Sequence, residues 1–377
     1  MVLYRDEVQN LLIFSIFIEK VKGIILHGGH GTRLRPLTHT GPKQLLSIAN
    51  KPMSRYALDD LIDAGITNIA IVIGDIFPDK VKEFYGNGDE LGAKIMYIYQ
   101  HKPGGIAHAI GLCRDFIGND RFVVYLGDNI LKGGIRNYVS RFRESEADAL
   151  ILLCEVKDPS RFGIATIREN HIEEIVEKPK NPKSNLAVIG IYFLTSKIFQ
   201  IIDNLPPSWR GELEISEALQ GLIGSGLKVE YDFVTGWWKD TGTPEDILDA
   251  NRFILDNLER EMINGIVESD SSLQGRIVIG KNTKISKGSI VRGPVIIGEN
   301  CQIGSRVYVG PFTSIGSNVY IKQGEVENSI IMNNCEINTH SRIVDSIIAN
   351  DSKIIDTPNS SPKGHRFLLG ERSQVFL

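Results

Sequence analysis

A glycine cluster followed by basic side chains lies near the beginning of the chain. The apolar residues 24–26 lead into the stretch 28–32, which holds three glycines, and Arg33 and Lys43 follow downstream. A buried strand that ends in a glycine cluster lets backbone N–H groups approach a phosphate with no Cβ atom in the way. Nearby cations can then neutralise the charge that the backbone holds. These residues therefore predict a polyphosphate-binding site.

Two common nucleotide-binding motifs do not fit this stretch. A Walker A loop requires Gly-x-x-x-x-Gly-Lys-Ser/Thr, and no such run follows Leu26. The dinucleotide fingerprint requires a third glycine where this chain has Leu34, and the acid expected about 20 residues further on is missing. A glycine-rich turn with solvated arginines is the structural alternative.

Two aspartates follow sequence cues for the end of a strand. Asp128 follows the apolar run 122–126 and a glycine, and Asp240 follows two tryptophans and a lysine. A carboxylate directly after a buried strand is well placed to hold Mg²⁺, which prefers oxygen ligands. The Gly-Asp-Asn sequence around Asp128 is also a good turn, so a purely structural role is the alternative. The two aspartates are 112 positions apart (240 − 128), so only the fold could bring them together.

The composition argues against several other kinds of protein. Charged residues make up 23% of the 377 and the net charge is −4, so no basic surface argues for nucleic acid. The four cysteines are widely spaced, which suggests neither a zinc site nor a disulfide framework and fits a reducing cytosol. The apolar run 11–18 is too short to span a bilayer, and its flanks do not form a signal peptide. We therefore expect a cytoplasmic protein with no nucleic-acid or membrane partner.

Alternating strand and helix patterns must position the candidate residues. The apolar runs 69–73, 122–126 and 149–153 are typical of strands buried on both faces, and residues 57–64 show helical spacing. Strands separated by helices imply crossover connections and a mostly parallel sheet. Ligands bind at the carboxyl ends of the strands in such sheets, and the glycine cluster and Asp128 both follow predicted strands.

Beyond about residue 262 the apolar pattern changes to a period of six. The rungs of this ladder are Ile279, Ile285, Val291, Ile297, Ile303, Val309, Ile315 and Ile321. A small or β-branched residue lies two positions before each later rung, and ladders of this kind predict a parallel β-helix. The register slips after Ile321 and resumes at Ile331, which indicates a loop or an offset coil.

Two longer motifs carry a resemblance to a known family. The first, Gly-x-Gly-Thr-Arg-Leu-x-Pro-Leu-Thr, covers residues 29–38, and the second, Pro-Lys-Gln-Leu-Leu, covers residues 42–46. Together they resemble the signature of the sugar-1-phosphate nucleotidyltransferases, and the second resembles that of the glucose-1-phosphate thymidylyltransferases in particular. The tail 360–377 is similar to the ending of the long form of these enzymes. The resemblance covers about residues 21–377.

The resemblance implies an α/β fold in two parts. A Rossmann-like, mostly parallel sheet would form a nucleotidyltransferase domain at 21–261, and the hexapeptide repeats would form a left-handed parallel β-helix at 262–356. An N-terminal extension, 1–20, and a C-terminal tail, 357–377, would flank them. Because the ladder carries no paired catalytic groups, we expect the β-helix to assemble a homo-oligomer rather than to catalyse.

The resemblance also implies roles for particular residues. The catalytic residues would be Arg33, Lys43, Asp128, Lys178 and Asp240, with Asp128 and Asp240 holding Mg²⁺. The nucleotide-binding residues would be Leu26, Gly28, Gly29, Gly31, Thr32, Arg33, Gln44, Gln100 and Gly105. The sugar-binding residues would be Asn129, Gly163, Glu177, Lys178, Val188, Tyr192 and Trp238. His108 is interpreted as a helix-start residue near the site.

The implied reaction transfers a nucleotidyl group from dTTP to glucose 1-phosphate and gives dTDP-glucose and pyrophosphate. Its nucleophile is a phosphate oxygen, already anionic at neutral pH, so the absence of a convincing Ser/His/Asp or Cys/His set agrees with this chemistry. In a single in-line displacement supported by Mg²⁺, Arg33 would grip the leaving pyrophosphate, Lys43 the attacked phosphorus region and Lys178 the incoming sugar phosphate.

Three alternatives remain open. The β-helix could acetylate an amino sugar, as it does in some relatives, but His340 is its only histidine and the sequence offers no evident partner for it. The nucleotide could be UTP or another triphosphate. The chain could also be a catalytically inactive regulatory or scaffold subunit, although the presence of all five predicted catalytic residues argues against this.

Overall fold

The computed structural model describes residues 20–29, 31–259, 261–356 and 371–376. The predicted N-terminal extension lies outside the described residues apart from Lys20, and so does most of the predicted tail. Among the helices in the described part of the chain, none is long and apolar enough to cross a membrane.

The chain divides into two compact units. The first unit comprises Met1–Gly29 and Ala57–Trp238, and the second comprises His30–Tyr56 and Lys239–Leu377. The predicted domain boundary near residue 261 lies where the sequence pattern changes from helix to β-helix. The two units instead group residues that contact one another in space. The segment that carries most of the predicted phosphate loop is therefore grouped with the β-helix.

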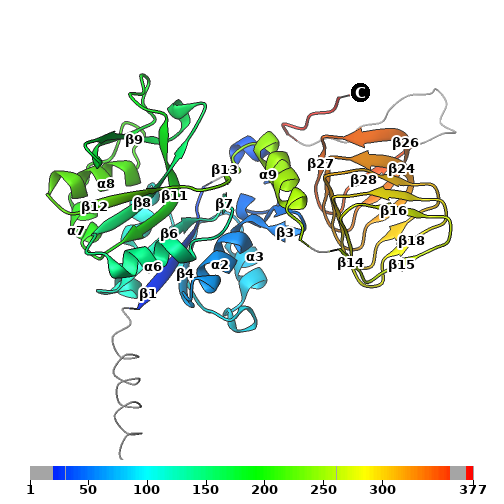
Figure 1. Cartoon of the computed structure of the whole chain (residues 1–377), viewed down its shortest axis with the longest axis horizontal. Coiled ribbons are helices and arrows are strands. Elements are labelled where there is room, and N and C mark those ends of the chain that lie inside the picture. The colour runs from blue at the N-terminus through cyan, green and yellow to red at the C-terminus, as the bar shows by residue number, and fades with distance from the viewer. Residues whose placement is uncertain (1–19, 30, 260, 357–370, 377) are drawn as a thin grey trace, which may run out of the picture. The chain divides into compact units, whose positions relative to one another are not determined.

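A nine-stranded sheet forms the centre of the first unit (Figure 1). Its strands are β1 (Val21–His27), β4 (Asn68–Ile73), β5 (Lys94–Tyr99), β6 (Arg121–Leu126), β8 (Ala149–Glu155), β9 (Gly163–Arg168), β10 (His171–Glu177), β11 (Leu186–Leu194) and β12 (Val229–Phe233). Their order is β10-β9-β11-β6-β1-β4-β5, with β8 pairing with β11 and β12. The short strand β7 (Asn129–Leu131) follows β6. All three apolar runs predicted as strands are confirmed.

The sheet is mixed rather than uniformly parallel. β1 is parallel to β4 and β6, and β4 is parallel to β5, which confirms the predicted crossovers in this half. β11 is antiparallel to β6, β8 and β9, and β9 and β10 form an antiparallel pair. An apolar run indicates a strand buried on both faces but carries no information on its direction.

Helices cover both faces of this sheet. They are α2 (Met53–Asp63), α3 (Pro78–Tyr85), α4 (Ile106–Gly111), α5 (Arg114–Ile117), α6 (Arg136–Glu144), α7 (Ile198–Asp203) and α8 (Ile215–Gly224). Apolar residues of α4, α7 and α8 share one buried cluster with β1 and β6. On the other face, the Tyr125 hydroxyl of β6 donates to Asp60 of α2 at 2.8 Å, and Phe142 of α6 packs against Phe193 of β11. The predicted helix at 57–64 is part of α2.

The second unit begins with short elements and a capped helix. They are the 3₁₀ turns η1 (Thr32–Leu34) and η2 (Lys43–Leu45), the hairpin β2 (Ser47–Ile48) and β3 (Lys51–Pro52), and α9 (Pro244–Asp256). The strand β13 (Trp238–Asp240) crosses the boundary between the units. Thr243 and Asp246 form a capping box at the start of α9, and Pro244 occupies the first turn, as its sequence predicts.

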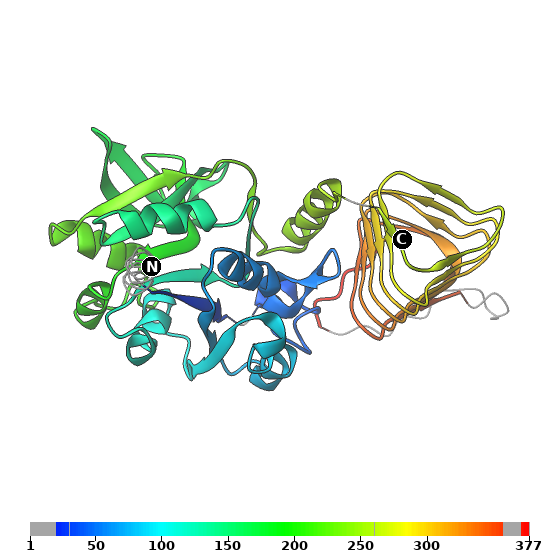
Figure 2. The ribbon, with the colours of Figure 1, turned by 60° about the horizontal axis from the view of Figure 1, so that its bottom comes forward.

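A left-handed parallel β-helix forms the rest of the second unit, and Figure 2 shows its triangular cross-section. Its strands are β14 (Met262–Ile263), β15 (Ile266–Val267), β16 (Ser272–Gln274), β17 (Ile277–Ile279), β18 (Lys284–Ile285), β19 (Ile290–Arg292), β20 (Val295–Ile297), β21 (Gln302–Ile303), β22 (Tyr308–Val309), β23 (Thr313–Ile315), β24 (Tyr320–Glu327), β25 (Ile330–Ile331), β26 (Glu336–Val344), β27 (Ile347–Ile348) and β28 (Lys353–Ile355). Ile279 pairs with Ile297 and Ile297 with Ile315, and all eight predicted rungs are fully buried. The predicted ladder is confirmed.

The predicted register slip is also confirmed. Ile315 pairs with Ile331, which is 16 residues on (331 − 315), and Ile331 pairs with Ile348, which is 17 residues on (348 − 331). Asparagines with positive φ turn the corners of the coil, and Nδ2 of Asn282 donates to Oδ1 of Asn300 at 3.1 Å. Asparagine tolerates this left-handed conformation better than most residues, so stacked asparagines suit the repeated corner.

The buried side chain of Asn251 connects α9 to the rest of the second unit. Its Oδ1 accepts from the backbone N–H of Ala49 and from the Ser314 hydroxyl, both at 2.9 Å, and its Nδ2 donates to the carbonyl of Phe312 at 3.0 Å. Because Asn251 is 1% exposed, an unmet bond there would leave a buried polar group unsatisfied. These bonds help to explain why residues 30–56 group with the β-helix.

Candidate active site

The carboxyl ends of three parallel strands bring predicted site residues together in the first unit. Gly28 follows β1, Gln100 follows β5, and Asp128 lies two residues after β6. The carbonyl of Leu26 accepts from the N–H of Gly127 at 3.0 Å, which joins the ends of β1 and β6. A Cβ atom at Gly28 would lie 3.4 Å from Oε1 of Gln100. Gly28 and Asp128 therefore lie at the carboxyl ends of strands, as predicted, and their roles in a site stay predictions.

Two neighbours orient the side-chain amide of Gln100. Its Nε2 donates to the carbonyl of Gly105 at 3.1 Å and lies 2.9 Å from Nδ1 of His108. With Nδ1 of His108 as the acceptor, the ring proton is on Nε2. Both amide hydrogens of Gln100 are then used, so its Oε1, next to Gly28, is the atom left to accept from a ligand. His108 lies in the first turns of α4, as interpreted, and in addition orients Gln100.

The backbone at Gly105 can accommodate only glycine. Its φ is 93°, and a Cβ atom there would lie 2.4 Å from the carbonyl oxygen of Leu213. That carbonyl accepts from Ala107 N–H at 3.0 Å, and Leu213 N–H donates to Gly104 at 2.8 Å. The loop that precedes α8 therefore clamps the glycine loop. The sequence did not predict this contact, because the two loops are more than a hundred residues apart.

Asn129 holds the carboxylate of Asp128 in place. Its Nδ2 donates to Oδ1 of Asp128 at 3.0 Å, and its Oδ1 accepts from Trp238 Nε1 at 2.7 Å and from Gly190 N–H at 3.3 Å. A Cβ atom at Gly190 would lie 2.8 Å from the Asn129 amide, so this close approach also requires glycine. Asn129 and Trp238, both predicted to bind sugar, therefore orient a predicted metal ligand.

The predicted sugar-binding residues Gly163, Glu177 and Lys178 lie together. One oxygen of Glu177 accepts from the Ser216 hydroxyl at 2.5 Å, and the other lies 3.2 Å from Nζ of Lys178. A Cβ atom at Gly163 would lie 2.5 Å from Oγ of Ser216. The N–H of Lys178 donates to Phe162 at 3.0 Å. The cluster offers a carboxylate and an ammonium group on adjacent residues.

Arg210 supports this cluster and was not among the predicted residues. Its Nε and Nη2 donate to the two oxygens of Glu214 at 2.9 and 2.8 Å, and its Nη2 donates to Glu212 at 2.9 Å. It also lies 4.0 Å from Glu177. The loop that contains Leu213 is thereby tied to the sugar cluster.

Two other predicted sugar-binding residues are packed in the main core. Val188 is 8% exposed and Tyr192 is 4% exposed, and both belong to the buried cluster that contains β1 and β6. Side chains covered to this extent shape a site mainly through packing. Their direct contact with a sugar stays a prediction.

His27 ends β1 and is buried beside Tyr85. Neither ring nitrogen has a hydrogen-bond partner among the described residues. Burial lowers the pKa of His27 to about 3, and the charge of Asp128 opposes this shift only in part. The imidazole is therefore neutral at physiological pH.

This histidine should make the first unit less stable in acid. The unfolded chain binds a proton at His27 near pH 6.5 but the folded chain does not until about pH 3, so stability falls as the pH drops below 6.5. At pH 5 the loss is about 2 kcal/mol. His27→Leu should remove this part of the pH dependence, measured by urea unfolding at pH 7 and pH 5. Tryptophan fluorescence reports on the first unit, since all three tryptophans lie in it.

The exposed His171 supplies a matched control for this experiment. His171→Gln should leave the pH dependence as in the unchanged protein. An equal loss of stability in acid for the unchanged chain and for His27→Leu would contradict the assignment.

The predicted phosphate loop has an open backbone in its glycine cluster. Gly29 has φ 97°, and a Cβ atom there would meet nothing within 4 Å. In the second unit, Gly31 has φ 59°, and its carbonyl accepts from the Thr38 hydroxyl at 2.8 Å. A Cβ atom at Gly31 would lie 3.4 Å from Cβ of Lys43. The loop therefore brings a predicted catalytic cation beside a glycine.

Arg33 lies against the segment that carries Asp240. A Cβ atom at Gly242 would be 3.1 Å from Nη2 of Arg33, and Gly242 is two residues after Asp240. The predicted nucleotide-binding residue Gln44 is 1% exposed, and its carbonyl accepts from the Ser54 hydroxyl at 3.0 Å. Arg33, a predicted catalytic residue, thus lies beside Gly242, two residues after Asp240, within the second unit.

Arg372 contacts the same loop from the C-terminal segment. Its Nη1 donates to the carbonyl of Thr32 at 3.1 Å, although 340 positions separate the two residues (372 − 32). Thr32 is one of the predicted nucleotide-binding residues. The sequence reasoning missed Arg372, because nothing in the local sequence connects the tail with the glycine cluster.

The structure gives His340 a partner, which corrects the expectation from the sequence. Its Nδ1 lies 2.9 Å from Oδ2 of Asp356, which also accepts from the backbone N–H of His340 at 2.6 Å. The Thr339 hydroxyl donates to the other oxygen at 2.8 Å. These hydrogen bonds lower the pKa of Asp356 to about 2. The pair comes from successive coils, a relation that the sequence alone did not reveal.

The predicted metal ligands Asp128 and Asp240 belong to different units. Their joint binding of a metal ion stays a prediction. In the described part of the chain, no group of three or more His, Cys, Asp or Glu side chains could hold a metal. Mg²⁺ is commonly bound through one or two carboxylates, with water and substrate phosphates as its other ligands. Two aspartates therefore fit a Mg²⁺ that is held together with its substrate.

Two family models match the chain. One described as nucleotidyl transferase matches residues 22–257, and one described as GMPPB C-terminal domain matches residues 291–359. A solved structure of a glucose-1-phosphate thymidylyltransferase from Bacillus anthracis, in complex with sucrose, is 45% identical with a TM-score of 0.60. That match covers 64% of this chain and 98% of the other.

Relatives match nearly the whole chain. The low-salt glycan biosynthesis nucleotidyltransferase Agl11 of Haloferax volcanii is 44% identical over 95% of this chain and 100% of its own. A glucose-1-phosphate thymidylyltransferase of Streptomyces antibioticus is 42% identical over 94% of this chain and 99% of its own. The bifunctional protein GlmU of Methanocaldococcus jannaschii is 34% identical over 86% of this chain and 76% of its own. Together with the β-helix and with the predicted site residues at the carboxyl ends of β1, β5 and β6, these matches establish that the chain belongs to the sugar-1-phosphate nucleotidyltransferase family.

Proposed function

We propose that this protein is a glucose-1-phosphate thymidylyltransferase that uses dTTP and Mg²⁺. The observation that carries the proposal is the oriented amide of Gln100, whose Oε1 lies beside Gly28 with both amide hydrogens used elsewhere. The Streptomyces antibioticus relative of the same name supports it, because the match extends over nearly the full length of both chains.

The orientation of Gln100 favours a pyrimidine with an imide edge. Thymine and uracil carry a hydrogen on N3 that Oε1 of Gln100 can accept, whereas neutral cytosine carries none there. Gly28 and Gly105 keep side chains away from the ring. Burial of the thymine methyl group adds only about 1 kcal/mol to the binding free energy, which corresponds to about fivefold in kcat/KM, so UTP should also react.

The predicted reaction needs charge neutralisation and alignment rather than a base. An oxygen of the sugar phosphate attacks the α-phosphorus, and the bond from that phosphorus to the bridging oxygen breaks, which releases pyrophosphate. Arg33 and Lys43 would bind the triphosphate, and Lys178 would bind the sugar phosphate while Glu177 accepts from sugar hydroxyls. A Mg²⁺ held by Asp128 and Asp240 would neutralise charge on the triphosphate.

A substrate panel tests the proposal. Pyrophosphate release is measured from dTTP, UTP, CTP, ATP and GTP, each with glucose 1-phosphate and with glucosamine 1-phosphate. We expect dTTP with glucose 1-phosphate to give the highest kcat/KM, UTP to follow, and CTP and the purines to be poor. Gln100→Glu should lower the kcat/KM for dTTP, because the amide nitrogen that donates both orienting hydrogen bonds, to Gly105 and to His108, is lost. A strong preference for a purine triphosphate would rule the proposal out.

Arg372 should contribute to nucleotide binding by holding the loop at Thr32. Arg372→Ala removes one exposed charge-assisted hydrogen bond, so the KM for dTTP should rise about two- to tenfold with little change in kcat. Gln374→Ala, in the same segment, should leave both constants unchanged. A lower kcat with an unchanged KM for dTTP would contradict this positioning role.

A second candidate activity is acyl transfer by the β-helix, which the His340–Asp356 pair favours. The amino group of an amino-sugar phosphate would attack an acyl thioester, His340 would take the amine proton, and the thiol would leave. Thiol release is measured with acetyl-CoA and glucosamine 1-phosphate, for the intact chain and for His340→Ala. Release that requires His340 would establish this activity, whereas its absence in the intact chain would exclude it.

Assembly is the role that we expect for the β-helix. Light scattering of the intact chain should give more than the mass of one chain, and a chain that ends before Ile279 should give a smaller assembly with some remaining transfer activity. Because the truncation removes the Ser314 and Phe312 partners of Asn251, it should also lower thermal stability. A monomeric intact chain would contradict the expected role.

A further inference from the structure

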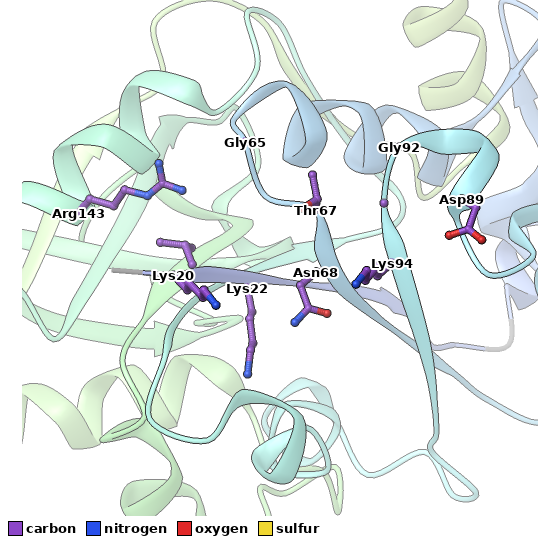
Figure 3. Close-up of a pocket in the computed structure, with 11 residues that line it drawn as sticks. Lys20, Lys22, Gly65, Thr67, Asn68, Asp89, Gly92, Lys94 and Arg143 are labelled. Carbon is purple, nitrogen blue, oxygen red and sulfur yellow. The ribbon is translucent and has the colours of Figure 1, made fainter. Parts of the chain in front are cut away.

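A basic pocket lies at the amino ends of β1, β4 and β5 (Figure 3), whereas Gly28, Gln100 and Asp128 follow the carboxyl ends of strands in the same sheet. It has a volume of about 590 Å³, within the range of small-molecule sites. Its lining comes from the beginnings of β1, β4 and β5 and from the end of α6. The polar lining residues are Lys20, Lys22, Thr67, Asn68, Asp89, Lys94 and Arg143.

One of the four cations is already neutralised. Nζ of Lys22 donates to the carbonyl of Phe116 at 2.6 Å and to that of Ile117 at 3.1 Å, and it pairs with Asp120 at 2.9 Å. Three acceptors satisfy the three hydrogens of its ammonium group. Lys22 therefore contributes its aliphatic stem to the pocket rather than a free charge.

The other three cations have no charge partner in the part of the chain that the structure describes. The side chains of Lys20, Lys94 and Arg143 form no hydrogen bond or ion pair with any described residue, and Nε of Arg143 is buried without an acceptor. The one acid in the lining, Asp89, accepts from Asn87 at 2.6 Å. Uncompensated cations around a concave site attract an anion, and a buried donor gains from a nearby acceptor or opposite charge.

Figure 3 shows how the polar groups are distributed. In this view Arg143 and Lys20 lie to the left of Asn68 and Lys94, and Lys20 directly precedes β1. Asn68 and Thr67 can donate to and accept from hydroxyl groups. None of the described lining residues is aromatic, so the pocket offers no ring on which a nucleobase could stack.

The pocket is remote from the residues predicted to catalyse. β1 runs for seven residues from Val21 to His27, about 20 Å, and Gly28 follows its far end. A ligand in the pocket would therefore not touch Gly28, Gln100 or Asp128. Binding there is separate from nucleotidyl transfer.

We propose that this pocket binds a sugar phosphate as a site distinct from the catalytic one. The phosphate is held by the cations of the pocket, and the sugar hydroxyls by Thr67 and Asn68. Phosphate supplies acceptors for the unpartnered guanidinium and ammonium groups, and a hexose fits the available volume. A nucleotide is disfavoured, because no ring recognises its base.

Lysine acetylation tests this on the intact protein. Acetylation of Lys20 and Lys94 by an amine-reactive reagent is followed by mass spectrometry, with and without glucose 6-phosphate as the probe. We expect the probe to slow acetylation at both residues about threefold or more at concentrations that occupy most of the sites. Lys157, an exposed lysine of the same unit, is the internal control and should be unaffected. Equal acetylation of Lys20 and Lys94 with and without the probe would overturn the proposal.

Further probes separate recognition of the phosphate from recognition of the sugar, and variants test the cations one at a time. Glucose should give no protection, and equal protection by inorganic phosphate would overturn the recognition of the sugar. Arg143→Ala and, independently, Lys94→Gln should weaken binding of glucose 6-phosphate by calorimetry, whereas Lys157→Gln should not. Pyrophosphate release should stay at its basal rate in all three variants. Unchanged glucose 6-phosphate affinity in both Arg143→Ala and Lys94→Gln would refute the site even if the proposed transfer activity holds.

Discussion

Asp128→Asn is expected to lower the rate of pyrophosphate release by about 100-fold or more while the protein remains folded. Asparagine keeps the size and the turn propensity of aspartate but removes the anionic oxygen. The side chain lies in the turn between β6 and β7, where Asn129 donates to it at 3.0 Å. Loss of the charge would weaken the Mg²⁺ that offsets the crowded phosphates. The assay is pyrophosphate release across a magnesium titration, with circular dichroism to verify folding.

Asp240→Asn should have an effect of similar size, and the double variant should be far from additive. If both aspartates act on one ion, removal of the second costs little once the first is gone. Asp120→Asn and Asp249→Asn are matched controls, because each breaks an ion pair without touching a predicted ligand. Near-normal rates at low magnesium in both folded variants would show the metal assignment to be wrong.

Gly105→Ala is expected to reduce kcat/KM for dTTP by about 10- to 100-fold. The new Cβ atom would lie 2.4 Å from the Leu213 carbonyl, and alanine is strained at φ 93°. One of the two loops must move, and either movement disturbs the amide of Gln100, which donates to Gly105. The measurement is steady-state kinetics with dTTP and glucose 1-phosphate, combined with thermal unfolding.

Gly211→Ala is the matched control for this prediction. Gly211 lies in the loop that contains Leu213 and also has a positive φ, 75°, but a Cβ atom there would meet nothing within 4 Å. The kcat/KM of the Gly211→Ala variant for dTTP should stay within about threefold of the kcat/KM of the unchanged protein. If Gly105→Ala were as active as Gly211→Ala, the close approach to Leu213 would have no bearing on nucleotide binding.

The sequence by itself determined the local elements and the places of some predicted site residues at the ends of strands. Apolar runs gave the strands at 69–73, 122–126 and 149–153, because a strand buried on both faces requires apolar residues at every position. The period of six gave the β-helix and even its register slip after Ile321. The rule that ligands bind at the carboxyl ends of parallel strands predicted that Gly28 and Asp128 lie near each other, because parallel strands expose these ends at one edge of the sheet.

The tertiary structure alone decided the contacts between distant segments. Neither the antiparallel direction of β11 nor the clamp of Leu213 on Gly105 leaves a local pattern in the sequence. The same holds for the contact of Arg372 with Thr32 and for the pairing of His340 with a residue of the next coil. Periodicity and turn chemistry act over a few residues, whereas these bonds join residues from 16 to 340 positions apart. Which partners meet is fixed only when the whole chain packs, because the burial of the shared core selects the arrangement.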